Sequence, residues 1–304
     1  MILSSLLKEQ EWVKAMIKIK RGLLMLLLII SIGCICLFVF YNICRKGNSA
    51  ASSGFIKYHI IAHNMGGGGV DSKEGFENAY ARGTRLFDAD LRFSKDGELI
   101  LCHEWEGVLG YFSFSKEDIY YNDINVGQVE RSLLPSKEEF CKTKIDNQYT
   151  MISFADVVEQ MKEWKDIYIV CDAKEDVEET YLSICKTADY NPDVLNRIVV
   201  SLYRADDFDI VKDIYPFKHL AIRQYENLPR SADEIINICK EKQINIVNVG
   251  TAYCDTDTIK AYKENGLQVY AAVVNDISYF DKLRDIGVDG IVSDFIYEDM
   301  IDAK

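Results

Sequence analysis

Two stretches decide the fold of this chain: Ile60-Ile61-Ala62-His63-Asn64 and Phe87-Asp88-Ala89-Asp90-Leu91-Arg92. In each, an apolar run of the length of a short β-strand leads into polar side chains. A third apolar run follows the turn Ser94-Lys95-Asp96-Gly97 and ends at Cys102-His103-Glu104. Enzymes built as barrels of parallel strands keep their chemistry at such strand ends. The region therefore predicts a barrel whose strand ends carry histidines and carboxylates.

Apolar runs of strand length alternate with segments of helical period over the rest of the chain. We expect strands near 56–62, 85–92, 98–103, 167–172, 197–202, 218–223, 244–249, 267–274 and 289–293, with helices such as Phe154 to Trp164, Ala232 to Lys242, Thr256 to Asn265 and Ser278 to Ile286 between them. This alternation is typical of a parallel sheet covered by helices. The second and third strands are separated by a turn too short for a parallel crossover, so they form an antiparallel hairpin. Eight parallel strands remain, which predicts a TIM-like (β/α)8 barrel over residues 56–304 with a hairpin arm.

Residues 105–150 interrupt this alternation and are rich in Tyr, Phe, Asp and Lys. A long insertion at the mouth of a barrel is typical of a lid or a substrate-binding element. A small surface subdomain is the alternative interpretation.

The segment Leu23 to Cys44 contains no charged residue. As a helix it would be about 33 Å long, the thickness of a bilayer core. We therefore predict one transmembrane helix over 23–44, preceded by an N-terminal segment, 1–22, and followed by a small polar linker, 45–55. A cleaved signal peptide fits less well because the apolar run is too long, and a lipoprotein site at Gly33-Cys34 lacks suitable preceding residues.

Charge sets the orientation of this span and limits the partners of the domain. Five Lys and Arg precede the span and two follow it, which predicts a cytoplasmic N-terminus and an extracellular domain at the cell membrane. The chain carries −13 and residues 1–46 carry +5, from seven basic and two acidic residues, so the remainder carries −18. Such a charge argues against nucleic acid as a partner. An anionic substrate would need a local cation.

Asp88 and Asp90 lie two residues apart on one strand, so both side chains face the same side. Two buried anions side by side are costly unless a cation compensates them. With Asp172 at the end of another strand, they predict a site for a divalent cation, Mg²⁺ or Ca²⁺. Solvated aspartates at strand ends are the alternative.

The chain has four histidines, and two of them, His63 and His103, end apolar strands. His59 and His219 fit structural positions within or at the start of strands. Hairpin pairing brings His103 back beside Ala89 and Asp90. One histidine can take a proton from an attacking oxygen while the other gives one to the leaving group.

Together these stretches resemble the glycerophosphodiester phosphodiesterase family, which belongs to the phosphatidylinositol phospholipase C-like superfamily. The matching motifs are Ala62-His63-Asn64, Asp71 to Phe76, Gly83 to Asp90, Ser94 to Gly97 and His103-Glu104, with Tyr168 to Lys174 and Gly287 to Asp294 further on. The resemblance spans about residues 56–297.

The resemblance implies a role for each candidate residue. His63 and His103 match the family's catalytic pair, and Asp88, Asp90 and Asp172 match its metal ligands, with Asp in place of Glu at two of the three. Lys174 matches a lysine that would hold a phosphate oxygen. The family has arginine directly after the first histidine, where this chain has Asn64, so we expect the phosphate pocket to be altered there.

The resulting hypothesis is a membrane-anchored, metal-dependent phosphodiesterase that hydrolyses small or polymeric substrates, glycerophosphodiesters or related polyol-phosphate compounds. The attacking group is a substrate hydroxyl or water. A phospholipase C- or D-like enzyme acting on intact lipid is a rival, favoured if residues 105–150 form an apolar lip. A catalytically degenerate barrel that binds a surface polymer is another, favoured by the missing arginine and opposed by the two histidines.

The predicted topology can be tested on intact cells. Because the basic residues cluster before the span, protease added outside should digest the domain while leaving a cytoplasmic control protein intact. The measurement is an immunoblot for the C-terminal part of the chain. Complete protection of the domain would overturn the orientation.

Overall fold

The computed structural model describes residues 57–66, 70–122 and 126–301. The predicted segments 1–22, 23–44 and 45–55 lie outside the described residues, and the transmembrane helix stays a prediction. Within the described ranges, every helix is too short or too polar to cross a membrane.

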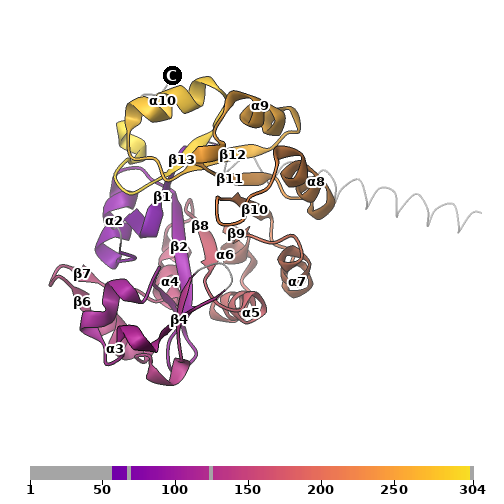
Figure 1. Ribbon diagram of the computed structural model, residues 1–304. Coiled ribbons are helices and arrows are strands. Elements are labelled where there is room, and N and C mark those ends of the chain that lie inside the picture. Colours follow the sequence, from indigo (N-terminus) through magenta and orange to yellow (C-terminus); the bar gives the residue numbers. More distant parts are fainter. Residues whose placement is uncertain (1–56, 67–69, 123–125, 302–304) are drawn as a thin grey trace, which may run out of the picture. The chain divides into compact units, whose positions relative to one another are not determined.

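Eight parallel strands form a closed barrel (Figure 1). In order around the barrel they are β1 (Ile60–Ala62), β2 (Leu86–Phe93), β8 (Tyr168–Ala173), β9 (Ile198–Leu202), β10 (His219–Gln224), β11 (Ile246–Gly250), β12 (Gln268–Ala272) and β13 (Gly290–Ser293). The barrel closes because β1 pairs with both β13 and β2, with Ile60 opposite Ile291 and Ile61 opposite Leu86. The predicted TIM-like barrel is confirmed.

The hairpin arm is also confirmed. Strand β3 (Leu99–Leu101) runs antiparallel to β2, with Leu91 opposite Leu101. Gly97 adopts a φ of +79° in the connecting turn, a conformation that glycine reaches without strain. Beyond β3, the amide of Cys102 donates to the carbonyl of Asp90 at 2.8 Å. The pairing therefore returns the chain to the strand that carries the aspartates.

Helices cover the outside of the barrel. They are α2 (Lys73–Ala81), α4 (Phe154–Glu163), α5 (Val177–Thr187), α6 (Pro192–Leu195), α7 (Asp207–Ile214), α8 (Ala232–Lys242), α9 (Thr256–Glu264) and α10 (Ile277–Asp285), with short 3₁₀ turns η2 (His63–Gly66), η6 (Thr251–Tyr253) and η7 (Glu298–Met300). The four helices expected from the sequence are confirmed to within one or two residues. Ser153 and Ser231 begin two of them through reciprocal capping boxes with Asp156 and Glu234.

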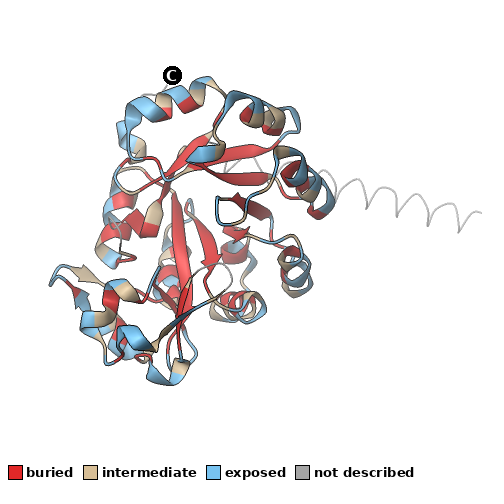
Figure 2. Cartoon of the chain, viewed as in Figure 1, coloured by how far each residue is buried: buried red, intermediate tan, exposed pale blue. Residues whose placement is uncertain are grey.

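Two apolar layers lie on the two faces of the sheet. The larger packs between the strands and the helices. The smaller fills the inside of the barrel and takes one residue from each strand: Ile61, Leu86, Val170, Val199, Ala221, Ile246, Tyr270 and Val292. Burial on both faces explains why the strands read as nearly continuous apolar runs, and Figure 2 shows them buried along most of their length. We call the inner cluster the apolar plug.

The insertion forms a small subdomain with its own apolar core. Its elements are η3 (Glu106–Tyr111), η4 (Lys116–Asp118), β4 (Ile119–Tyr121), β5 (Gly127–Val129), η5 (Arg131–Leu133), α3 (Lys137–Lys142), β6 (Lys144–Ile145) and β7 (Tyr149–Thr150). Trp105, Phe114 and Phe140 pack at its centre. The amide of Gln128 also donates to the carbonyl of Lys174 at 2.8 Å, which ties the subdomain to the end of β8. Its role as a lid stays a prediction.

The plug predicts a stability difference between two leucines. Leu86 is fully buried in it, whereas Leu133 is 45 % exposed. Leu86→Ala should lower the free energy of unfolding by about 2–5 kcal/mol because it leaves a cavity. Leu133→Ala should change it by less than about 0.5 kcal/mol. Urea unfolding followed by tryptophan fluorescence measures both, and equal effects would contradict the proposed packing.

Candidate active site

A polar layer lies directly above the apolar plug, toward the carboxyl ends of the strands. Side chains alternate between the faces of a strand, so the residue two positions after each plug residue points the same way. These residues are His63, Asp88, Asp172, Ser201, Arg223, Asn248, Ala272 and Asp294. Seven of the eight are polar. A step of two residues along each strand thus separates the apolar core from the candidate site.

A cavity of about 450 Å³ opens at this layer. Its lining includes His63, His103, Asp88, Asp90 and Lys174, which the sequence predicted together. Asp172 lies beside it and contacts Lys174. The structure therefore brings both candidate histidines, the three candidate carboxylates and the candidate lysine to one place.

Two cations lie between the three buried carboxylates. The ammonium of Lys174 is 2.9 Å from Asp90 and 2.7 Å from Asp172. Across the barrel, the guanidinium of Arg223 is 3.0 Å from Asp88 and 3.1 Å from Asp172. Asp90 and Asp172 are directly paired in the β2–β8 register, which explains how one lysine reaches both.

These contacts shift the pKa values of Asp88 and Asp90, the two aspartates of β2, in opposite directions. Burial raises the pKa of Asp90, but the charge and hydrogen bond of Lys174, together with the charges of His103 and Arg223, outweigh burial and hold that pKa well below its ordinary value. For Asp88, burial and the charge of Asp90 prevail over Arg223 and raise the pKa. Asp90 is thus the more firmly ionised of the pair.

His63 is held by a carboxylate from the last strand. Its Nδ1 lies 2.7 Å from Oδ1 of Asp294, which directly follows β13. The amide of Asn275 donates to Oδ2 of Asp294 at 2.7 Å, and its oxygen accepts from the main-chain N–H of Asp294 at 2.9 Å. This chain of contacts fixes the imidazole through Nδ1, and no hydrogen bond to Nε2 occurs among the described residues.

His103 is held through its main chain. The fully buried side chain of Arg92 donates from Nε to the carbonyl of Cys102 at 3.0 Å and from Nη2 to the carbonyl of His103 at 2.8 Å. Its guanidinium also lies 5.5 Å from the ring centre of Trp105. Arg92 therefore fixes the turn that presents His103 to the cavity.

The two imidazoles lie 6.3 Å apart, centre to centre, and their pKa values are shifted in opposite directions. Burial would lower the pKa of His63, but Asp294 and the charges of Asp88 and Asp90 raise it above its ordinary value. For His103, burial dominates and lowers the pKa, although Asp90 opposes the shift. A pair tuned apart in this way suits one acid and one base.

Asn64 and Asp71 lie in a neighbouring hollow of about 260 Å³, which shares His63 and His103 with the main cavity. Asn64 is almost fully buried in a left-handed conformation, and its Oδ1 has no hydrogen-bond partner among the described residues. Asp71 is also buried, and burial together with the charges of Asp90 and Asp88 raises its pKa well above the ordinary value. Its carboxyl group therefore keeps its proton to a higher pH than an exposed aspartate does. Contact of Asn64 with phosphate stays a prediction.

The model of the glycerophosphoryl diester phosphodiesterase family matches residues 71–298. The chain belongs to this family. As the family's name states, it is an enzyme of the phosphoric diester hydrolase class, which confirms the resemblance drawn from the sequence.

Solved structures with the same fold include several described as glycerophosphodiester phosphodiesterases. One from Galdieria sulphuraria, described as putative, has a TM-score of 0.63 at 17 % identity, covering 80 % of this chain and 96 % of that one. One from Thermotoga maritima has a TM-score of 0.57 at 15 % identity, covering 78 % and 95 %. A phosphodiesterase from Oleispira antarctica, in complex with the product sn-glycerol-3-phosphate, has a TM-score of 0.60 at 16 % identity, covering 78 % and 93 %. At these identities the likeness concerns the fold. Curated proteins gave no match to the sequence.

The buried carboxylate oxygens of this phosphodiesterase are the type of ligand that a hard divalent cation binds. Oδ2 of Asp90 and Oδ1 of Asp172 are buried and have no hydrogen-bond partner among the described residues. Buried carboxylate oxygens without a partner are what Mg²⁺ and Ca²⁺ bind. As they stand, no three His, Cys, Asp or Glu side chains in the described ranges are grouped closely enough to hold an ion. Lys174 and Arg223 contact the same carboxylates, so a bound ion would share these with them.

Sequence reasoning missed three residues of this site: Arg223, Asp294 and Asp71. Arg223 lies on a strand outside every quoted motif, whereas Asp294 ends the motif Gly287 to Asp294 but was given no role there. A signal did exist, because each stands two positions after a residue of the apolar plug, Ala221 and Val292. Asp71 lay within the quoted motif, but its position in a loop gave no reason to expect burial.

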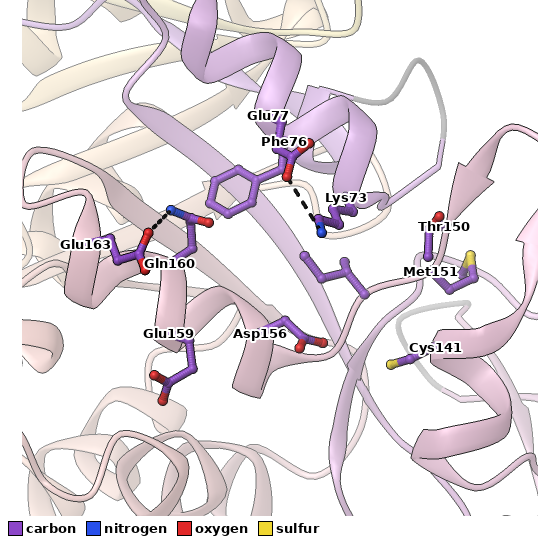
Figure 3. A pocket seen from close by; sticks show the side chains of 11 residues that line it. Lys73, Phe76, Glu77, Cys141, Thr150, Met151, Asp156, Glu159, Gln160 and Glu163 are labelled. Atoms are coloured by element: carbon purple, nitrogen blue, oxygen red, sulfur yellow. Dashed lines mark hydrogen bonds and ion pairs between the residues drawn. The ribbon is translucent and has the colours of Figure 1, made fainter.

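A further hollow lies away from the candidate histidines and carboxylates. It measures about 350 Å³ and lies between α2, α4 and the insertion (Figure 3). Its charged side chains are mostly acidic, and two contacts join its lining residues, Lys73 to Glu77 at 3.8 Å and Gln160 to Glu163 at 3.4 Å. None of the residues predicted for the active site lines it.

The contact between Asp294 and His63 predicts a pH effect. Because the folded-state pKa of His63 lies above the value of about 6.5 for an unfolded histidine, its protonation stabilises the fold below that pH. This stabilisation is lost as the pH rises through the folded-state pKa. Asp294→Asn should lower the pKa of His63, which NMR titration of its ring protons measures. His59, which pairs with Glu298, serves as the control and should titrate unchanged; an unshifted His63 would contradict the contact.

Proposed function

We propose that this chain is a membrane-anchored, metal-dependent phosphodiesterase that hydrolyses glycerophosphodiesters or related polyol-phosphate compounds. The observation that carries the proposal is the pair His63 and His103, oppositely tuned and facing one cavity with Lys174. Membership of the family supports the reaction class. The product named for the Oleispira antarctica structure, sn-glycerol-3-phosphate, supports the substrate class.

The two histidines divide the proton transfers. His103, whose pKa is lowered, is neutral near pH 7 and takes the proton of the attacking hydroxyl or water. His63, whose pKa is raised, donates a proton from Nε2 to the leaving oxygen while Asp294 holds Nδ1. Both rings line the same cavity, so one phosphoryl group bound there could contact both.

The remaining polar residues bind charge. Asp88, Asp90 and Asp172 would hold a divalent cation, Mg²⁺ or Ca²⁺, which when bound neutralises charge on the phosphoryl oxygens. Lys174 holds a non-bridging phosphate oxygen, and Asn64 offers a neutral amide beside His63. This assignment agrees with the unpartnered oxygens of Asp90 and Asp172.

The location forms part of the same proposal. A transmembrane helix over 23–44 would hold the enzyme at the cell membrane with its N-terminus in the cytoplasm and the barrel outside. The basic residues before the span support this orientation.

The insertion contributes little apolar surface to the cavity that could bind the acyl chains of an intact lipid. Of its described residues, 105–122 and 126–150, Val126 is the one that lines the cavity. This favours a small polar head group over intact lipid. The presence of both histidines in the cavity favours catalysis over binding alone.

We expect His63→Ala and His103→Ala each to lower turnover by about 10²–10⁴-fold, the usual contribution of a general acid or base. The matched control is His59→Gln, because His59 lies before β1 at the opposite end of the barrel and pairs with Glu298. Its turnover should stay near that of the natural protein. Circular dichroism checks that each variant is folded. Near-full activity in a folded His63 or His103 variant would end the two-histidine mechanism.

Substrate and metal are tested together by incubating the protein with a panel of glycerophosphodiesters, with and without EDTA. Glycerol phosphate should be released from at least one of them, and EDTA should abolish its release. Adding back Mg²⁺ or Ca²⁺ should restore it. Release that is unaffected by EDTA would contradict metal dependence but leave the phosphodiesterase assignment standing.

A further inference from the structure

The residue beside His63 leaves phosphate recognition incomplete. Asn64 is neutral, and its side chain lies in the smaller hollow rather than along the main cavity. A phosphodiester carries one full negative charge. Lys174 supplies one cation, but two carboxylates already hold its ammonium.

Arg223 enters the main cavity from the opposite wall. It stands two positions after the plug residue Ala221 on β10, so its side chain points into the barrel. It lines the cavity with Lys174, His63 and His103. Tyr203 and Tyr225 flank the guanidinium, with ring centres 5.5 and 5.8 Å away. The side chain is thus positioned by the fold and still borders open space.

The hydrogen bonds of Arg223 leave some N–H groups of its guanidinium without an acceptor among the described residues. Nε donates to the hydroxyl of Ser201 at 2.9 Å, Nη2 to Asp88 at 3.0 Å, and Nη1 lies 3.1 Å from Asp172. A guanidinium has five N–H groups. These contacts leave at least one N–H on each terminal nitrogen without a hydrogen-bond partner among the described residues. Two N–H groups of one planar fork match two oxygens of a phosphate.

The net charge of the buried side chains also supports a contact between Arg223 and phosphate. The three aspartates Asp88, Asp90 and Asp172 and the two cations Lys174 and Arg223 leave one net negative charge. One divalent ion, on the function proposed above, turns this into one net positive charge. A phosphodiester monoanion neutralises it. Without Arg223 the loaded site would be neutral before substrate arrived, and bound substrate would leave an uncompensated buried charge, which is costly.

We propose that Arg223 is the phosphate-binding arginine of this enzyme and that it replaces, from β10, the cation missing at Asn64. The phosphoryl group then lies against β8 and β10, between Lys174 and Arg223, and within reach of both histidines. Tyr203 and Tyr225 form the wall next to it. This inference rests on the proposed function and names the residue that sets its phosphate specificity.

The test uses the full chain in detergent and sn-glycerol 3-phosphate as the probe. Binding is measured by calorimetry, and KM and kcat are measured on a glycerophosphodiester that the natural protein hydrolyses. Arg223→Lys keeps the positive charge beside Asp88 and Asp172 but loses the fork. It should weaken probe binding by about 10- to 100-fold, the equivalent of one charge-assisted hydrogen bond, and should raise KM accordingly.

Arg197→Lys is the matched control. Arg197 is also buried, but it donates only to main-chain carbonyls, those of Asp193, Trp164, Ile167 and Met161. Its replacement should lower thermal stability and leave probe affinity unchanged. Natural affinity in a folded Arg223→Lys protein would show that Arg223 serves only as a counter-ion and would overturn the proposal.

A second variant keeps the proposal testable if Arg223→Lys does not fold. Ser201→Ala removes the acceptor of Nε without unpairing a carboxylate, so it should weaken probe binding by about 2- to 10-fold. Unchanged binding would count against Arg223. Should the natural protein fail to hydrolyse the panel yet bind the probe through Arg223, the proposed function fails and the phosphate site stands. Failure of the natural protein to bind the probe overturns the phosphate site itself.

Discussion

Three aspartates, Asp88, Asp90 and Asp172, carry negative charge inside the barrel, where they are almost inaccessible to solvent. Breaking a buried ion pair typically costs about 3–5 kcal/mol because one charge is left uncompensated. Lys174 and Arg223 remove that penalty, and they reach the aspartates only if β2, β8 and β10 close around them. The barrel and its chemistry therefore depend on the same ion network. Below it the apolar plug keeps water from the other end.

Much of the fold could be predicted from the sequence because its signals are local. Strands buried on both faces read as apolar runs, and the turn ending at Gly97 fixed the antiparallel arm. The structure shows that Ser153 and Ser231 cap α4 and α8 at the starts that the sequence predicted. The insertion was different. Its short strands and turns are held by packing around Trp105 and Phe140, which no local pattern reveals. Residues 23–44 remain a sequence prediction.

The candidate site was predictable where its residues share a motif. His63 and Lys174 directly follow strands, His103 lies just beyond one, and Asp90 lies within β2. Their neighbours in sequence match the family motifs, and the structure gathers all four around one cavity. Arg223 stayed hidden because its partners lie far away in the chain, 135 positions in the case of Asp88. Such partners become visible only once the plug residues are known, since the alternation of the strands then fixes which side chains follow them inward.

His63 and Asp294 lie at the two ends of the barrel sequence, 231 positions apart. Their contact forms only when β13 has docked against β1. A nascent or C-terminally clipped chain would lack the Asp294 contact that orients His63 and raises its pKa, however much of the sheet had already assembled. On the proposed mechanism, the His63–Asp294 pair is therefore incomplete until the last strand has docked. If His63 acts as proposed, turnover would report that β13 has closed the barrel against β1.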